Sequence, residues 1–144
     1  MANPHRLPRT VLPRRYALTL TPDLAAATFS GHVDIDVELA EPTTEVVLNA
    51  IELEIDAAWV SVGTTRHHAT VSLDEDTERA TLHLPDEVPA GDAVVSLRFQ
   101  GLLNDKLRGF YRSTFTDDDG TERVIATTQF EATDARRAFP CWDE

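Results

Sequence analysis

The stretch His32–Leu39, "HVDIDVEL", decides the fold because apolar and acidic residues alternate along it without interruption. Val33, Ile35, Val37 and Leu39 fall on one side of an extended chain, and the acids fall on the other. A period of two with acids on one side is typical of a β-strand that packs one face on a core and exposes the other to water.

The same alternation continues on both sides of this stretch. Tyr16, Leu18 and Leu20 predict a strand that Pro22-Asp23 closes, and "IELEID" at residues 51–56 repeats the acidic pattern. Further strand-like runs are "ATVSL" (69–73), "RATLHL" (79–84), "AVVSLRF" (93–99), "GFYRSTF" (109–115) and "RVIATTQF" (123–130). Because no ten-residue helical pattern separates them, we expect an all-β antiparallel sandwich or a large twisted sheet.

Turn signals and the two ends of the chain complete the predicted organisation. "DDDG" at residues 117–120 predicts a hairpin tip, where Gly120 is able to adopt a positive φ. "TDARRAF" at residues 133–139 predicts a short helical turn, capped by Thr133 or Asp134 and ended by Pro140. We expect a single domain over residues 1–144, with residues 1–12 as a loose arm and His67-His68 in a turn.

Charge and composition exclude several classes of function. The net charge is −12, and 15 acids face only two arginines between Asp34 and Asp92, which disfavours binding to nucleic acid. The apolar runs are far shorter than the ~20 residues that span a membrane, so no membrane association is expected. The chain shows no secretory signal, and its one cysteine cannot form an internal disulfide, so we expect a cytoplasmic protein.

The residues alone offer no self-contained catalytic or metal-binding set. None of the five histidines belongs to an H-E-x-x-H pattern, and the glycines form no phosphate-binding loop. Cys141 is expected to be a buried structural thiol. Glu131, between Phe130 and Ala132, needs no explanation if it is exposed, whereas a buried carboxylate there requires a cation. Arg136, Arg137 or a ligand ammonium are the candidates for that cation.

Two late motifs resemble a known family. "GLLNDKLRGFYRSTF" (101–115) and "ATTQFEATDARRAFPCWDE" (126–144) closely resemble the N-terminal domain of the M1 zinc aminopeptidases, the puromycin-sensitive and aminopeptidase N group. The start of the chain is similar as well, so the resemblance extends from about Leu12 to Glu144. It implies a saddle-like β-domain, truncated here, that packs on a thermolysin-like catalytic domain of the same parent chain.

The resemblance also implies a division of the site between two domains. Glu131 corresponds to an acid that binds the α-amino group of a peptide substrate, and Gln129 lines the pocket for the first side chain. Zinc, its ligands and the general base belong to the catalytic domain, so this fragment alone is expected to be inactive, without catalytic residues or metal. Ala132 departs from the family, which usually has proline there.

The remaining residues of the second motif are expected to be structural. Asp134 and one of the neighbouring arginines should brace the turn, and Phe139, Cys141 and Trp142 should pack in the core or between domains. A non-catalytic interaction module or scaffold of the same family is the alternative function, and an unrelated adhesion or carbohydrate-binding β-sandwich is a weaker one.

Overall fold

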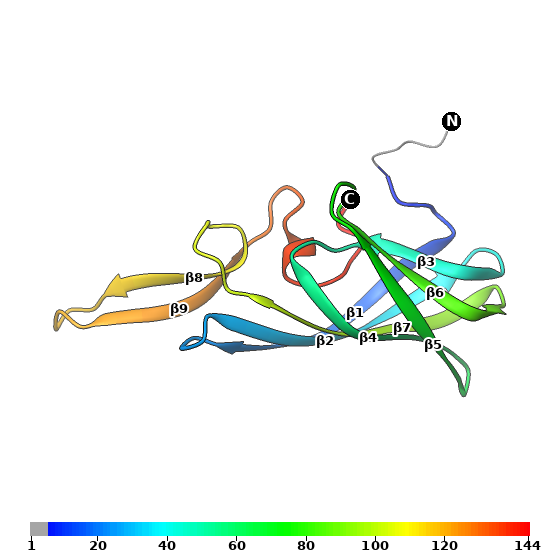
Figure 1. The fold of residues 1–144 in the computed structure, drawn as a ribbon, viewed down its shortest axis with the longest axis horizontal. Coiled ribbons are helices and arrows are strands. Elements are labelled where there is room, and N and C mark those ends of the chain that lie inside the picture. The colour runs from blue at the N-terminus through cyan, green and yellow to red at the C-terminus, as the bar shows by residue number, and fades with distance from the viewer. Residues whose placement is uncertain (1–5) are drawn as a thin grey trace.

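A computed structural model describes residues 6–144 and shows an almost entirely β protein, drawn in Figure 1. Within those residues the elements are β1 (Val11–Asp23), β2 (Thr28–Leu39), β3 (Thr43–Asn49), β4 (Leu53–Val62), β5 (Thr65–Asp74), β6 (Arg79–Val88), β7 (Gly91–Leu102), β8 (Gly109–Thr116), β9 (Glu122–Gln129) and the 3-10 helix η1 (Ala135–Arg137).

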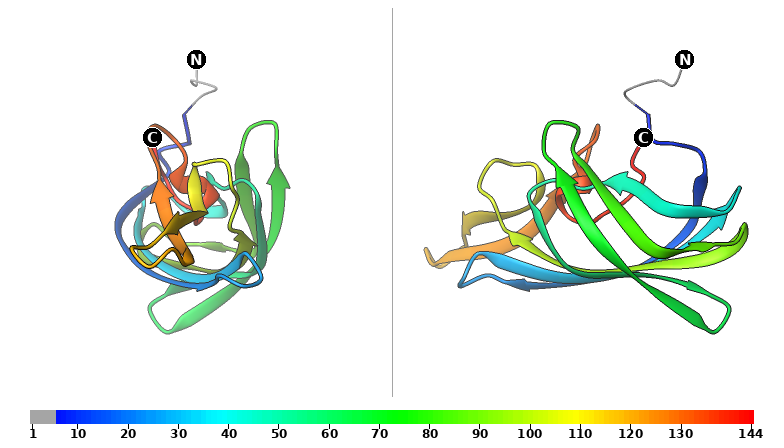
Figure 2. Two further views of the ribbon diagram at one scale, coloured as in Figure 1. Left: turned by 90° about the vertical axis from the view of Figure 1, so that its left-hand side faces the viewer. Right: turned by 45° about the vertical axis from the view of Figure 1, so that its right-hand side comes forward.

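Strands β1 to β7 form one antiparallel sheet in the order β1-β2-β7-β4-β5-β6-β3, and β8 pairs with β9 in a separate hairpin. The long sheet curls because β5 changes partner along its length. Residues 65–69 of β5 pair with β4, and residues 70–74 pair with β6. Figure 2 shows the resulting curl, with the β8–β9 hairpin projecting from the body. The predicted all-β antiparallel fold is therefore confirmed, in the form of a single curled sheet.

One hydrophobic core lies inside the curl. The apolar residues of "HVDIDVEL" point into it, and Val33, Ile35 and Val37 are fully or almost fully buried. Val46 of β3 and Leu82 of β6 belong to the same buried cluster. Strands from both halves of the curled sheet, β2 on one side and β6 and β3 on the other, therefore contribute to one core.

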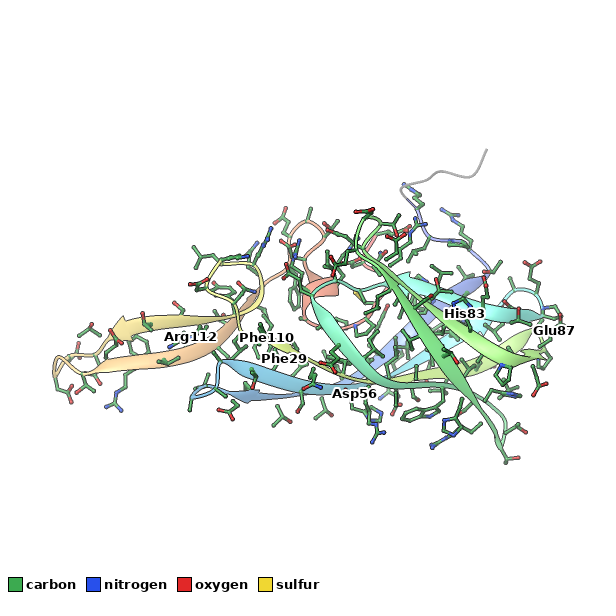
Figure 3. The ribbon with its side chains drawn as sticks, viewed as in Figure 1. Phe29, Asp56, His83, Glu87, Phe110 and Arg112 are labelled. Carbon is green, nitrogen blue, oxygen red and sulfur yellow. The ribbon has the colours of Figure 1, made fainter. Side chains whose placement is uncertain are left out.

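Two glycine–phenylalanine pairs hold the centre of the sheet together. Gly31 of β2 lies opposite Phe99 of β7, and Phe29 lies opposite Gly101 in the same ladder. A Cβ atom added to Gly31 would lie 2.4 Å from Cζ of Phe99, and one added to Gly101 would lie 2.6 Å from Cζ of Phe29. Each ring thus occupies the space above a glycine. The Phe29 ring also meets Phe110 of β8 at a centroid distance of 5.1 Å, which joins the hairpin to the sheet (Figure 3).

The start of the chain differs from the predicted loose arm. Residues 1–5 lie outside the described part, but Val11 and Leu12 already belong to β1. Val11 is buried and pairs with Leu39, and Leu7 is buried and donates its N–H to the Glu144 carboxylate. Pro13 fits into β1 because this is an edge strand with a register shift after the proline.

One further strand prediction was wrong in its limits, and one strand was missed. The strand predicted at residues 51–56 begins only at Leu53, because Glu52 has a φ of +59°, and it continues to Val62 past an irregularity between Ile55 and Ala57. This irregularity changes which residues face inward. The alternation of apolar and polar residues in the first half of β4 therefore does not continue into the second half. Strand β3, whose "TTEVVLN" does not alternate, was not predicted.

The predicted turns near the end of the chain are mostly confirmed. Residues 117–120 form the tip of the β8–β9 hairpin, and Gly120 has a φ of +85°. The predicted helical turn is η1, preceded by Asp134 as its N-terminal cap residue, although the Asp134 side chain makes no capping hydrogen bond. His67-His68 was wrongly assigned to a turn and belongs to β5.

We predict that Gly31→Ala lowers the free energy of unfolding by about 1–3 kcal/mol, because the new methyl group displaces the Phe99 ring. An uncrowded Gly→Ala change within a strand is expected to have the opposite sign. Urea titration of the variant and of Ser30→Ala, on the solvent-facing side of the same strand, measures the difference. An unchanged or higher stability of Gly31→Ala would contradict the close packing.

Candidate functional site

The two predicted substrate-binding residues lie where the β8–β9 hairpin rejoins the body. Gln129 ends β9, and its partner across the hairpin is Gly109. Glu131 lies in the loop that follows, which the N–H of Asp134 closes by donating to the Phe130 carbonyl at 2.8 Å. Both side chains are exposed. The structure therefore places Gln129 and Glu131 together at one end of the hairpin.

The carboxylate of Glu131 has no ion pair or hydrogen bond with any other residue in the range 6–144. The peptide bond from Glu131 to Ala132 is cis. Neither Arg136 nor Arg137, the internal cations considered from the sequence, is paired with Glu131. Both arginines bind other carboxylates, which leaves the Glu131 carboxylate directed to solvent.

Arg136 binds two acids from distant parts of the chain. Its Nη1 lies 2.9 Å from Oε2 of Glu78, in the turn between β5 and β6, and its Nη2 lies 2.9 Å from Oδ1 of Asp143. Only 12% of the Arg136 side chain and 10% of the Asp143 side chain are exposed. Burial acts against the charged guanidinium, but the hydrogen bonds and charges of Asp143 and Glu78 outweigh it and raise the pKa of Arg136.

Arg137 gathers three acids around one guanidinium. Its Nε donates to Oδ1 of Asp134 at 2.8 Å, its Nη1 forms an ion pair with Oε1 of Glu52 at 2.8 Å, and its Nη2 lies 3.7 Å from Oε1 of Glu78. Burial again opposes the charge, and Asp134 and Glu52 outweigh it, so the pKa of Arg137 is raised. The predicted bracing of the turn by Asp134 and an arginine is confirmed, and both arginines contribute.

The backbone after η1 adds to the sheet through the connection between β3 and β4. Asn49 and Cys141 exchange both backbone hydrogen bonds, at 2.8 and 3.0 Å, and the N–H of Ile51 donates to the Arg136 carbonyl at 3.1 Å. The side-chain amide of Asn49 also donates to Asp143 at 2.9 Å. The segment that follows the Glu131 loop is thus fixed to the body along its length.

Aromatic contacts cover the same segment. Phe130 packs edge-on against Phe139 with ring centroids 6.1 Å apart, and Phe139 packs in the same way against Tyr16 at 5.9 Å. The N–H of Trp142 donates to the Tyr16 hydroxyl at 2.9 Å. Burial is the main cause that raises the pKa of Tyr16 to about 12, and burial also raises the pKa of the Cys141 thiol. The expected packing roles of Phe139, Cys141 and Trp142 are confirmed within the chain.

Glu52 and Glu78 are the site-supporting residues that the sequence reasoning missed. Both have a positive φ, +59° and +56°, in connections between strands, and both direct their carboxylates at the arginines. Two adjacent arginines in an apolar segment do signal that acids must surround them. With 25 acids in the chain, that signal does not identify which ones.

The described residues contain no metal centre of their own. Across residues 6–144, no group of three or more histidine, cysteine, aspartate or glutamate side chains is arranged to hold a metal ion. In the same range, no helix has the length and apolar character needed to cross a membrane.

Comparison with known proteins decides the family. Residues 12–144 match the family described as the peptidase M1 N-terminal domain. The chain belongs to this family. This M1 N-terminal domain is 48% identical over 139 residues to aminopeptidase M1-D of Oryza sativa subsp. japonica and 44% identical over 144 residues to aminopeptidase M1 of Arabidopsis thaliana.

More distant relatives show the same pattern of coverage. The puromycin-sensitive aminopeptidase of Caenorhabditis elegans is 41% identical over 143 residues. Each match covers 96% of this M1 N-terminal domain, which spans only 15–16% of the length of these relatives.

We predict that Arg136→Met lowers the free energy of unfolding by about 3–5 kcal/mol, because Asp143 then stays buried without its cation. Arg123→Met is the matched control, since Arg123 pairs with Asp117 but is 56% exposed, and its loss is expected below about 1 kcal/mol. Denaturant titration of both variants measures the difference. Equal effects would show that the Arg136 network adds no more than a surface ion pair.

We predict that stability falls as the pH rises from about 10 to about 12, partly through Tyr16. Above its ordinary pKa of ~10 a tyrosine in the unfolded chain loses its proton, whereas Tyr16 in the folded chain retains it up to about pH 12. Unfolding titrations at pH 9–12 should show a shallower decline for Tyr16→Phe, because Cys141 contributes equally to both proteins. Parallel pH profiles would contradict this role of Tyr16.

Proposed function

We propose that this chain is the substrate-anchoring N-terminal domain of a zinc metallo-aminopeptidase that removes N-terminal amino acids from peptides. Glu131 binds the α-ammonium group of the substrate, and Gln129 lines the pocket for its first side chain. A catalytic domain in the rest of the parent chain holds the zinc ion and activates water. The supporting observation is the exposed, unpaired carboxylate of Glu131 on a firmly braced loop of an M1 N-terminal domain.

The chemistry of the substrate fits a lone carboxylate. A peptide α-ammonium group has an ordinary pKa of ~7.7–8.0 and is largely charged at neutral pH. A carboxylate makes charge-assisted hydrogen bonds to it, and these strengthen when the site closes and water leaves. Because Glu131 has no internal cation among the described residues, its charge is available to the ligand. A fixed distance from this contact to the zinc ion would restrict hydrolysis to the first peptide bond.

Exposed apolar residues supply a surface for the catalytic domain. Leu102 and Leu107, in the region that leads into β8, are 71% and 65% exposed. Phe115 and Ile125 are also exposed, and their pairing positions place them diagonally on one face of the β8–β9 hairpin. Large exposed apolar side chains near one another mark a contact surface in soluble proteins. We propose that they contact the remainder of the parent chain.

Glu131→Gln in the full-length protein tests the proposal. Removing the charge should lower kcat/KM for aminoacyl-anilides, since the α-ammonium group loses its charged partner. The decrease should correspond to a loss of about 2–5 kcal/mol of transition-state stabilisation. Glu122→Gln, an exposed acid at the other end of β9, should leave kcat/KM unchanged. Steady-state kinetics measure both variants, and similar behaviour of the two would contradict the proposed role of Glu131.

The isolated chain offers a separate test. It should bind no stoichiometric zinc and hydrolyse no aminoacyl-anilide at an enzyme-like rate, which metal analysis and a peptidase assay measure. Enzyme-like turnover by residues 1–144 alone would overturn the division of the site between two domains.

A non-catalytic interaction module remains the second candidate, because the exposed apolar residues around β8 suit any protein partner. A full-length protein that folds but shows no zinc-dependent peptidase activity would favour it. The cytoplasmic location stays a prediction from the sequence.

A further inference from the structure

The aliphatic stem of Arg137 packs beside Gly109 of β8. Gly109 pairs with Gln129, the last residue before the loop, and has a φ of +70°. A Cβ atom added to Gly109 would lie only 2.8 Å from Cβ of Arg137 and 3.5 Å from its Cδ. The absence of a side chain at Gly109 therefore lets the Arg137 stem rest on the strand that holds Gln129 in place.

The head of the same side chain contacts the other end of the loop. Its Nε donates to Oδ1 of Asp134 at 2.8 Å, and its backbone N–H donates to the Asp134 carbonyl at 3.1 Å. Asp134 in turn donates its N–H to Phe130, directly before Glu131. Arg137 thus packs on the strand that pairs with Gln129 and bonds to Asp134 at the far end of the loop, and within residues 6–144 it makes no ion pair or hydrogen bond with Glu131.

The body of the protein fixes Arg137 from the opposite side. Only 10% of its side chain is exposed, and its two terminal nitrogens form ion pairs with Glu52 at 2.8 Å and with Glu78 at 3.7 Å, which come from two different connections of the sheet. Several carboxylates arranged around one planar guanidinium fix its orientation, which the single ammonium of a lysine does not do. Arg137 is therefore a rigid connection between the curled sheet and the loop.

We infer that Arg137 is a positioning residue, which sets the direction of the Glu131 carboxylate and thereby the recognition of the substrate α-ammonium group. The inference rests on the proposed function and extends it, because it assigns the selectivity for a free amino terminus to a residue that does not touch the substrate. Without the guanidinium, Glu52, Glu78 and Asp134 repel one another, and the end of the loop at Asp134 is released.

A double-mutant cycle in the full-length protein tests the inference. The readout is the ratio of inhibition constants for leucine hydroxamate and its des-amino analogue, 4-methylpentanohydroxamate, which differ only in the α-amino group. Arg137→Met keeps most of the stem and removes the charge, and it should lower the preference for the amino-bearing inhibitor by about tenfold or more. Arg123→Met, the same change at an exposed ion pair on the hairpin, should leave the ratio unchanged.

The Glu131→Gln background separates positioning from general destabilisation. If Arg137 acts through Glu131, Arg137→Met should change the inhibitor ratio little once Glu131 is replaced. An unchanged ratio in the single variant, or an equal loss in both backgrounds, overturns the inference. If Glu131→Gln itself leaves the inhibitor ratio unchanged, the proposed function fails. The effect of Arg137 on the loop is then measured separately, by hydrogen exchange.

Amide hydrogen exchange gives a readout that does not depend on activity. The N–H of Asp134, bonded to Phe130, should exchange at least tenfold faster in Arg137→Met, while amides of β2 stay as protected as before. Unchanged exchange at Asp134 overturns the inference. If Arg137→Met does not fold, Arg137→Lys replaces it in both measurements, and a wild-type ratio with wild-type exchange would overturn the inference equally.

Discussion

Two adjacent arginines carry their charge to a nearly buried position against the sheet, and the rest of the site depends on how that charge is balanced. Moving a guanidinium out of water is unfavourable unless carboxylates replace the lost hydration. Here four acids do so, Glu52, Glu78, Asp134 and Asp143, and each arginine binds more than one of them. Two of these acids come from connections between strands and two from the segment around η1. The balance of charge therefore fixes the end of the chain to the sheet.

The pairing of β3 with β6 brings two of these acids, Glu52 and Glu78, close together. Because β3 pairs with β6 and Asn49 lies opposite Arg79, the β3–β4 connection with Glu52 lies close to the β5–β6 turn with Glu78. The backbone reports the same proximity, since the N–H of Ala50 donates to the Glu78 carbonyl at 3.0 Å. Both glutamates have a positive φ, which turns their side chains out of the strand direction and toward the arginines.

The parts that were predictable from sequence are those that local patterns determine. Strict alternation in "HVDIDVEL" predicted β2 and its buried face, and "DDDG" predicted the hairpin tip, because each depends only on neighbouring residues. Alternation failed where a register irregularity shifted β4 and where β3 has no clear period. The pairing of Glu52 and Glu78 with the arginines joins residues about 60 to 85 positions apart, and no local pattern encodes a contact over that separation. The positions of Gln129 and Glu131 came from family resemblance, and their substrate roles stay a proposal.

Glu131 differs from the acids around it in a way that supports the proposed recognition of an ammonium group. Arginines form ion pairs with Glu52, Glu78, Asp134 and Asp143. Glu131, only three residues from Asp134, has no partner among the described residues. Arg136 and Arg137 are paired with other carboxylates, and neither is paired with Glu131. A braced loop with an unpaired carboxylate favours the binding of an ammonium group, because a preorganised charge needs no rearrangement when the ligand arrives.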